Sequence, residues 1–170
     1  MSETFKEYLI KQKKSSADIM AQIGLVAGSI ILAIAAFMFG GDFIGPILIV
    51  GILFGAGFLF SRFSREYEYI LTNNELDIDV IYNRSRRKRV MTIDMKKIEI
   101  MASIKDERHQ AELNKGYKVV NVSDNSNDEN TYVIMTQTPS KGTCKVIFSP
   151  NEAFVNDLFR QAPNKVFKRI

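Results

Sequence analysis

The chain has 170 residues, enough for about one soluble domain and a smaller additional part. Its 23 Lys and Arg against 19 Asp and Glu give a net charge of +4, too small an excess for a dedicated nucleic-acid-binding protein. A single cysteine, Cys144, cannot form an intramolecular disulfide or a paired-thiol site, so the sequence fits a reducing compartment and suggests no redox role.

Residues 1–18 are a basic N-terminal segment, and two long apolar runs follow it. The first run, 19–39, has 21 residues without a charge, long enough to cross a hydrocarbon core of about 30 Å as a helix. After a short turn at 40–42, the second run, 43–60, is also uncharged and within the spanning range. Because a second run follows so closely, a cleavable signal peptide is disfavoured. The sequence predicts a transmembrane hairpin over 19–60.

Basic residues flank this hairpin on both sides. They are Lys6, Lys11, Lys13 and Lys14 before the first run, and Arg62 and Arg65 after the second. The connecting turn contains no Lys or Arg. Since cytoplasmic flanks carry the excess of basic residues, we predict a multi-pass protein of the cell membrane with both termini in the cytoplasm.

Small residues recur at a spacing of four within the two runs. Gly24 and Gly28 form one such pair, and Gly51 and Gly55 form the other. This spacing lets helix backbones approach closely, either within the hairpin or between two copies of the protein. Glycine is also simply common in membrane helices, so helix packing and a homo-oligomer are hypotheses here.

Residues 61–170 form the predicted cytoplasmic domain, in which apolar residues recur with a period of two. Strands are predicted at 66–72, 75–82, 88–94, 97–103, 117–123, 131–138 and 143–149, with a short helix inside 105–116. Ser149, Pro150 and Glu152 match a capping box, with Ser149 as the N-cap. The predicted helix that follows buries Phe154 and Leu158 and stops before Pro163.

Seven antiparallel strands in a four-plus-three barrel or sandwich, capped by a C-terminal helix, resemble the pleckstrin-homology-like (PH-like) architecture. The closer resemblance is carried by two apolar runs that lead into EYEYILTNNELDIDVIYNRSRRKRVMTIDMKKIEIM, residues 66–101. With these features the chain resembles bacterial membrane-anchored PH-like proteins, including a small family in clostridia and their relatives, from Lys6 to Phe159. The resemblance implies a fold and a location, and it implies no particular activity.

The segment NRSRRKR, residues 83–89, carries Arg84, Arg86, Arg87, Lys88 and Arg89. The first strand leaves the membrane and the second returns, so the turn at 83–87 is predicted to lie near the bilayer, where each basic residue contributes about 1 kcal/mol on anionic lipid. A solvated hairpin tip remains the alternative. The run lacks interleaved aromatic residues, which disfavours nucleic acid.

PH domains that bind phosphoinositides usually carry basic residues at the first hairpin turn. Here the first predicted turn, 72–75, carries none, so the resemblance favours a general electrostatic contact with lipid.

The sequence contains no pattern that names a reaction, a metal or a cofactor. His109 lies in a charged stretch and is expected to be a solvated loop residue, and Cys144 is expected to be a core or edge residue of a strand. Glu75, Asp77 and Asp79 share a strand face, but side chains two apart stand about 6–7 Å from each other and do not converge on a cation. We therefore expect no enzyme and no metal site, and a solvated acidic face opposite basic neighbours.

Two functions remain open. In the first, the protein presents its PH-like module for protein interaction or scaffolding, oriented by basic contacts to anionic lipid, with the protein partner unidentified. In the second, it is an accessory subunit of a membrane transport or envelope-assembly complex, and the transmembrane hairpin makes the contacts.

Overall fold

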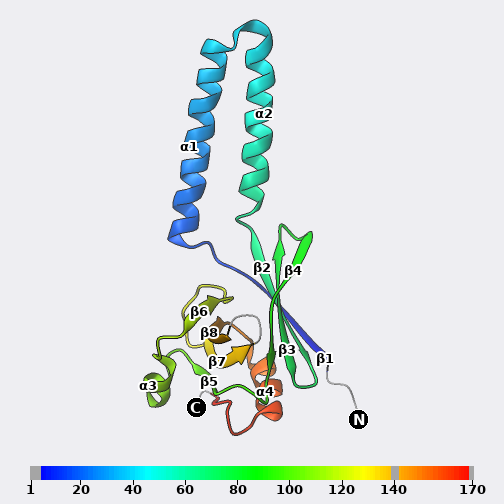
Figure 1. Cartoon of the computed structure of the whole chain (residues 1–170), viewed down its shortest axis with the longest axis vertical. Helices are drawn as coiled ribbons and strands as arrows, with labels where there is room; N and C mark the ends of the chain where they lie inside the picture. Colours follow the sequence, from blue (N-terminus) through cyan, green and yellow to red (C-terminus); the bar gives the residue numbers. More distant parts are fainter. Residues whose placement is uncertain (1–4, 139–141, 169–170) are drawn as a thin grey trace. The chain divides into compact units, whose positions relative to one another are not determined.

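The computed structural model describes residues 5–138 and 142–168, and the chain divides into two units. One unit is a helical hairpin over 14–65, together with the turn at 82–85. The other is a domain of two β-sheets, formed by the described residues of 1–13, 66–81 and 86–170. Along the chain, the first strand of the domain precedes the hairpin and all other strands follow it (Figure 1). The hairpin is therefore an insertion into the domain.

The hairpin consists of α1 (Ser16–Phe39) and α2 (Gly41–Ser61), which contain both predicted spans. Within these two helices only Gln22, Ala36 and Gly45 are buried. Both helices are long and apolar enough to cross a membrane. Their large apolar side chains are exposed, which is typical of helices that lie in an apolar surrounding such as a bilayer.

Glycine is required at the tip of the hairpin. The Gly40 N–H donates to the Ala36 carbonyl at 2.9 Å, and a Cβ at position 40 would lie 2.5 Å from that same oxygen. The next residue, Gly41, has a φ of +62° and already begins α2. The connection is thus even shorter than the predicted turn at 40–42.

At the other end of the hairpin, basic side chains lie over aromatic rings of α2. The Lys14 ammonium is 5.6 Å from the centroid of Phe60, and the Arg62 guanidinium is 5.1 Å from that of Phe58. Long cationic side chains pack their stems on apolar surface while the charge stays in water. This arrangement suits the boundary between hydrocarbon and headgroups.

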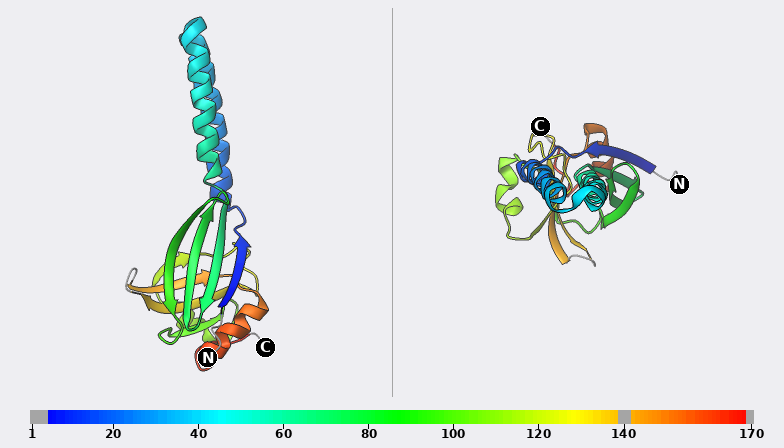
Figure 2. Two further views of the ribbon diagram at one scale, coloured as in Figure 1. Left: turned by 90° about the vertical axis from the view of Figure 1, so that its right-hand side faces the viewer. Right: turned by 90° about the horizontal axis from the view of Figure 1, so that it is seen from above.

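The first sheet has four antiparallel strands in the order in which they occur along the chain. They are β1 (Phe5–Lys11), β2 (Arg65–Thr72), β3 (Glu75–Tyr82) and β4 (Arg86–Asp94). The pairing of β1 with β2 runs from Phe5 opposite Thr72 to Lys11 opposite Glu66. Figure 2 shows β1, in blue, beside the three green strands. Residues 5–11, expected only as a basic segment, are the edge strand of this sheet.

The second sheet has the order β5-β7-β8-β6. Its strands are β5 (Ile100–Ser103), β6 (Lys118–Asn121), β7 (Tyr132–Thr138) and β8 (Gly142–Phe148). Strand β6 pairs parallel with β8, whereas the other pairs are antiparallel. Between β5 and β6 lie a 3₁₀ turn, η1 (Glu107–His109), and α3 (Gln110–Leu113), which confirms the predicted short helix.

The predicted seven-strand, four-plus-three barrel is wrong. The described residues form eight strands in two four-stranded sheets that do not close. The strand predicted at 97–103 is β5 and belongs to the second sheet, and β1 takes the fourth place in the first. The error has a physical cause: the partner of β1 lies across the whole hairpin, so no local pattern indicates the pairing.

Tyr69 of β2 is the centre of the core between the sheets and is 0% exposed. Its hydroxyl donates to the Val122 carbonyl at 2.6 Å and accepts from the Ser149 N–H at 3.2 Å. Its ring centroid lies 5.4 Å from Phe148 and 6.2 Å from Phe154. One side chain thus links the first sheet, the second sheet and the C-terminal helix.

The C-terminal helix α4 (Glu152–Gln161) begins two residues later than predicted from the capping box. Its N-cap is Asn151, whose side chain accepts from the Phe154 N–H at 2.8 Å. Ser149 is not the cap, because its hydroxyl donates to the Asp124 carboxylate at 2.8 Å inside the domain. Phe154 and Leu158 are buried and the helix ends before Pro163, as predicted.

Candidate functional site

The basic segment begins in the turn between β3 and β4. Asn83 and Arg84 form this turn with φ of 48° and 56°, and the Ser85 N–H donates to the Tyr82 carbonyl at 3.1 Å. The Asn83 N–H donates to the Ser64 carbonyl, at the end of the hairpin, at 3.1 Å. The other four basic residues, Arg86 to Arg89, are not in the turn but open strand β4.

Two of these four residues are engaged on the face of the first sheet. The Arg87 guanidinium lies 2.7 Å from one oxygen of Glu68 on β2 and 2.8 Å from the other. Arg89 pairs with Asp77 at 2.7 Å and with Asp79, both on β3. Their charges are partly neutralised by the sheet, so they are the least available of the segment for lipid.

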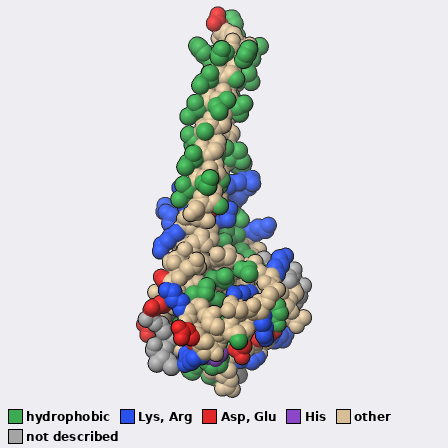
Figure 3. Space-filling model, turned by 90° about the vertical axis from the view of Figure 1, so that its left-hand side faces the viewer, with side chains coloured by type: hydrophobic (Ala, Val, Ile, Leu, Met, Phe, Trp, Pro, Cys, Tyr) green, Lys and Arg blue, Asp and Glu red, His purple; other side chains and the backbone are tan. Residues whose placement is uncertain are grey.

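Arg86 and Lys88 differ from their two neighbours. Both are exposed, and neither side chain makes an ion pair or hydrogen bond with another residue of 5–138 or 142–168. They are interleaved with Arg87 and Arg89 along β4. Figure 3 shows hydrophobic side chains covering the hairpin, whereas Lys and Arg side chains appear on the surface of the domain. Arg86 and Lys88 are therefore the basic residues of the segment that remain available to an anionic ligand.

The acidic face predicted from Glu75, Asp77 and Asp79 does lie opposite a basic neighbour on β4, but it is not uniformly solvated. Asp79 is 3% exposed and Glu68 is 1% exposed. Within the described parts of the chain, no group of three or more His, Cys, Asp or Glu residues has a geometry that could hold a metal ion. The carboxylates are arranged to bind arginine side chains of the same sheet.

Glu68 is the most perturbed carboxyl group on this face. Burial raises its pKa from an ordinary 4.5 to about 7; a hydrogen bond with Glu7 of β1 adds to the shift, and the charge of Arg87 opposes it. A carboxyl pair that shares a hydrogen bond holds one proton more readily than two isolated groups do. The contact with Glu7 joins β1 to β2, and the raised pKa of Glu68 makes its protonation depend on pH. Sequence inspection misses this pair because it requires the register between strands on either side of the hairpin.

The side chains of His109 and Cys144 are both packed against other residues of the domain. The His109 ring lies 4.1 Å from the Phe167 ring centroid, and its Nδ1 is 3.2 Å from Asp106. Its side chain is 17% exposed, so the expectation of a solvated loop residue is wrong. Cys144 is fully buried in β8, as expected for a core residue.

The four glycines predicted to support helix packing do not bring α1 and α2 together. A Cβ at Gly24, Gly28, Gly51 or Gly55 would meet no atom within 4 Å. Their small faces are open, so they do not support close packing within the hairpin, and packing between copies remains a prediction.

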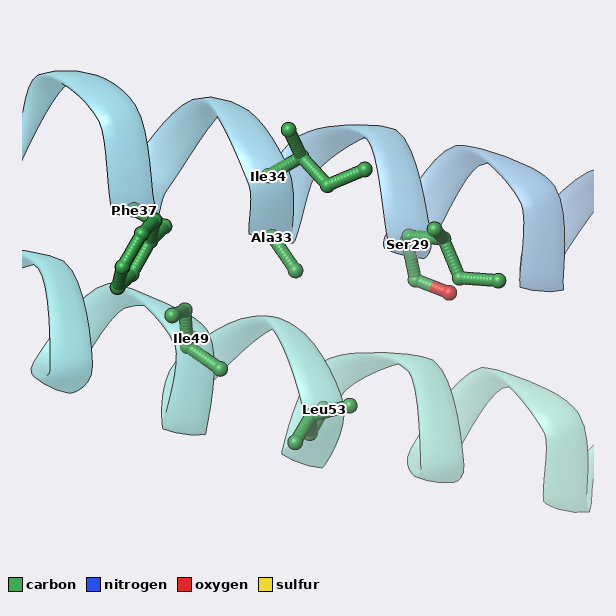
Figure 4. Close-up of a pocket in the computed structure, with 7 residues that line it drawn as sticks. Ser29, Ala33, Ile34, Phe37, Ile49 and Leu53 are labelled. Atoms are coloured by element: carbon green, nitrogen blue, oxygen red, sulfur yellow. The ribbon is translucent and has the colours of Figure 1, made fainter.

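The two helices leave an apolar groove of about 330 Å³ between them. Figure 4 shows side chains from both helices around it: Ser29, Ala33, Ile34 and Phe37 of α1, and Ile49 and Leu53 of α2. The Ser29 hydroxyl donates to carbonyls of its own helix, at 2.8 Å to Leu25 and 2.9 Å to Val26. The groove therefore presents an apolar surface, typical of one that contacts acyl chains or another helix.

A family model described as bacterial PH-like domain (DUF6106) matches residues 2–168. The match includes β1, the hairpin and α4, so it spans both units. No curated protein matches the chain.

Proposed function

The chain belongs to the bacterial PH-like domain family, and from this premise we propose that it holds a PH-like module at a membrane as an interaction surface for a protein partner. The observation that carries the proposal is the pairing of β1 with β2. These two strands are the chain segments on either side of the hairpin, so the membrane anchor is built into the fold and is not appended to it.

This pairing also supports a topology. Because β1 and β2 lie in one sheet, both ends of the hairpin must emerge on the same side of the membrane. Lys14 and Arg62 lie at these ends, whereas the tip at Gly40 carries no basic residue. Since cytoplasmic flanks carry the excess of basic residues, this distribution supports a cytoplasmic position for the domain and both termini.

The turn between β3 and β4 supports an orienting contact with lipid. Its backbone bonds to Ser64 at the base of the hairpin, and Arg86 and Lys88 follow it. Near an anionic leaflet each of these charges contributes about 1 kcal/mol, which is small beside the insertion energy of two spans. The basic residues would orient the module, and the hairpin would retain it.

The absence of tryptophan from the sequence allows a direct test of this orientation. A single indole is introduced as Ser85→Trp, or as Glu75→Trp at the opposite end of β3, about 25 Å away. In nanodiscs with brominated anionic lipid we expect quenching at position 85 and little at position 75. Arg86→Ser with Lys88→Ser should reduce the quenching at 85, while the matched pair Lys105→Ser with Lys118→Ser should not. Equal quenching at both positions would overturn the orienting role.

The interaction role is tested by crosslinking and pull-down from native membranes. Full-length protein is compared with a chimaera in which 16–61 is replaced by an unrelated two-span helical hairpin. If the domain holds the partner, the chimaera retrieves it as well as the full-length protein does. Loss of the partner from the chimaera would defeat the proposal.

A second candidate function has its own support in the open faces of Gly24, Gly28, Gly51 and Gly55. According to this second candidate, the protein is an accessory subunit of a membrane transport or envelope-assembly complex, and a transmembrane helix of another subunit packs on these faces. Loss of the partner on hairpin replacement is the result that this candidate predicts.

A further inference from the structure

One edge of the first sheet is open. Strand β1 stands at the end of the order β1-β2-β3-β4 and pairs with β2 on one side only. Along Phe5–Lys11, no backbone hydrogen bond to another described segment is made on its other side. An unpaired strand edge presents a row of N–H and C=O groups that can accept a further strand.

A groove of about 500 Å³ runs beside this strand. Four consecutive residues of β1, Tyr8 to Lys11, line one wall. The loop at 124–130 and the segment at 149–152, which leads into α4, supply residues of the other walls. A groove that follows four residues of an edge strand has a length of about 13 Å, which fits a short extended peptide.

The walls of the groove are acidic. Asp128 and Glu152 line it, and neither forms an ion pair with a Lys or Arg of the described chain. Asp124 also lines it and has Lys13 at 3.7 Å. Burial raises the pKa of Asp124, but hydrogen bonds from Ser126 and Ser149 and the charge of Lys13 outweigh it, so that its pKa lies below the usual value. Against these carboxylates, Lys11 is the basic residue among the lining residues.

We propose that an extended segment of a partner protein, carrying Lys or Arg, adds to the first sheet along the open edge of β1. Its backbone bonds to β1, and a cationic side chain reaches the carboxylates of Asp128 and Glu152. The inference rests on the proposed interaction function and names where on the module the partner docks and what chemistry it carries.

The probe is a fluorescent heptapeptide of alternating Arg and Val, titrated against full-length protein in nanodiscs of zwitterionic lipid, with empty nanodiscs as the blank. Two comparison peptides separate the contribution of backbone hydrogen bonds from that of charge. One keeps the sequence but carries N-methyl groups on alternate backbone nitrogens, and the other replaces each Arg by Glu. We expect each change to weaken binding at least tenfold, because strand addition needs both the N–H groups and the opposite charge.

The protein is varied in the same assay. Asp128→Asn with Glu152→Gln removes two charges while keeping hydrogen-bond acceptors, and should weaken the peptide about three- to tenfold. Glu107→Gln with Glu112→Gln removes two exposed carboxylates outside the groove and should leave the affinity unchanged. Equal binding of the N-methylated peptide, or no peptide binding at all, would overturn the inference. The proposed function would survive that result if the chimaera with the replaced hairpin still retrieved its partner.

Discussion

The hairpin and the domain bury their apolar side chains against different surroundings. In α1 and α2 the large apolar side chains point outward, with Phe37 74% exposed and Phe54 82% exposed, whereas Tyr69 and Leu71 of β2 are 0% exposed. The exposed apolar surface of the hairpin suits an apolar surrounding such as lipid, whereas the domain encloses a core of its own. The comparison teaches that the two units bury apolar surface in different ways. They are nevertheless connected, because the chain must pass through the hairpin before the sheet that contains β1 is complete.

The geometry of the hairpin allows β1 and β2 to pair although 53 residues separate them, from Gln12 to Ser64. Packed antiparallel helices keep their ends about 8–10 Å apart, so the insertion of 16–61 brings β1 close to β2 as a short loop would. The turn at 72–75, expected to be the first hairpin turn of the domain, is the second connection of the sheet. The helical hairpin itself is the first connection.

The largest expected effect comes from breaking the contribution of β1 to the core. Ile10→Asp places a charge at a position that is 8% exposed, and should destabilise the domain by about 3 kcal/mol or more. The hairpin should remain in the micelle, since its exposed apolar side chains do not belong to the core of the domain. Limited proteolysis of the full chain in micelles measures the stability of the domain and the protection of the hairpin. The neighbouring change Leu9→Asp, at a position 49% exposed, should cost under about 1 kcal/mol; equal effects at the two positions would mean that β1 does not pack as described.

The next effect concerns the hydroxyl at the centre of the domain. Tyr69→Phe leaves the Val122 carbonyl and the Ser149 N–H without their partner, and should lower the free energy of unfolding by about 1–3 kcal/mol. Urea titration followed by circular dichroism measures the change. Tyr82→Phe, whose hydroxyl makes no hydrogen bond to another described residue, serves as the control. A loss as large in the control would remove the central role of Tyr69.

A smaller effect should appear as a dependence on pH. Since the pKa of Glu68 is raised in the folded chain, the folded state binds an extra proton between pH 4.5 and about 7, and stability falls as the pH rises through this range. Glu68→Gln should raise the free energy of unfolding by about 1–2 kcal/mol at pH 8 and by little at pH 4. Urea titrations at the two pH values test this, with the exposed Glu75→Gln as the control. If the gain in the free energy of unfolding were the same at both pH values, the raised pKa of Glu68 would be contradicted.

The smallest effect is expected in the hairpin. Gly28→Ala should change its stability by less than about 0.5 kcal/mol, because no atom lies within 4 Å of the new methyl group. Gly40→Ala should disrupt the tip, where the same group would meet the Ala36 carbonyl at 2.5 Å. Unfolding in increasing sodium dodecyl sulfate, followed by far-ultraviolet circular dichroism, compares them. If Gly28→Ala instead shifted the oligomeric state, its open face would be an interface between copies.

These contrasts show why one unit could be predicted from the sequence and the other only in part. An uncharged run of apolar residues is enough to predict a membrane helix, and alternation is enough for β2, β3, β7 and β8. The edge strand FKEYLIK is short and basic, and its pairing with β2 bridges the hairpin, so its role depends on register. Likewise, the pattern SPNE predicted Ser149 as the N-cap, but the Ser149 hydroxyl bonds to Asp124 inside the domain and Asn151 caps the helix.

The candidate sites, too, could be predicted only as far as they depend on composition and not on strand pairing. The basic segment could be located from its composition, but its separation into paired Arg87 and Arg89 and available Arg86 and Lys88 depends on which carboxylates the sheet brings to β4. The groove beside β1 could not be predicted without β1 itself.

The central claim, that the hairpin is inserted between two paired strands of one domain, is tested most directly by cysteine crosslinking in native membranes. Glu7 lies opposite Ile70 in the register of β1 and β2, and Cys144 is buried and does not compete. Glu7→Cys with Ile70→Cys should form a disulfide on mild oxidation, at least tenfold faster than Glu7→Cys with Thr72→Cys, which is displaced by two residues, about 7 Å. Mass spectrometry of the joined peptides gives the rates. Equal rates for the two pairs, or no disulfide in either, would contradict the insertion.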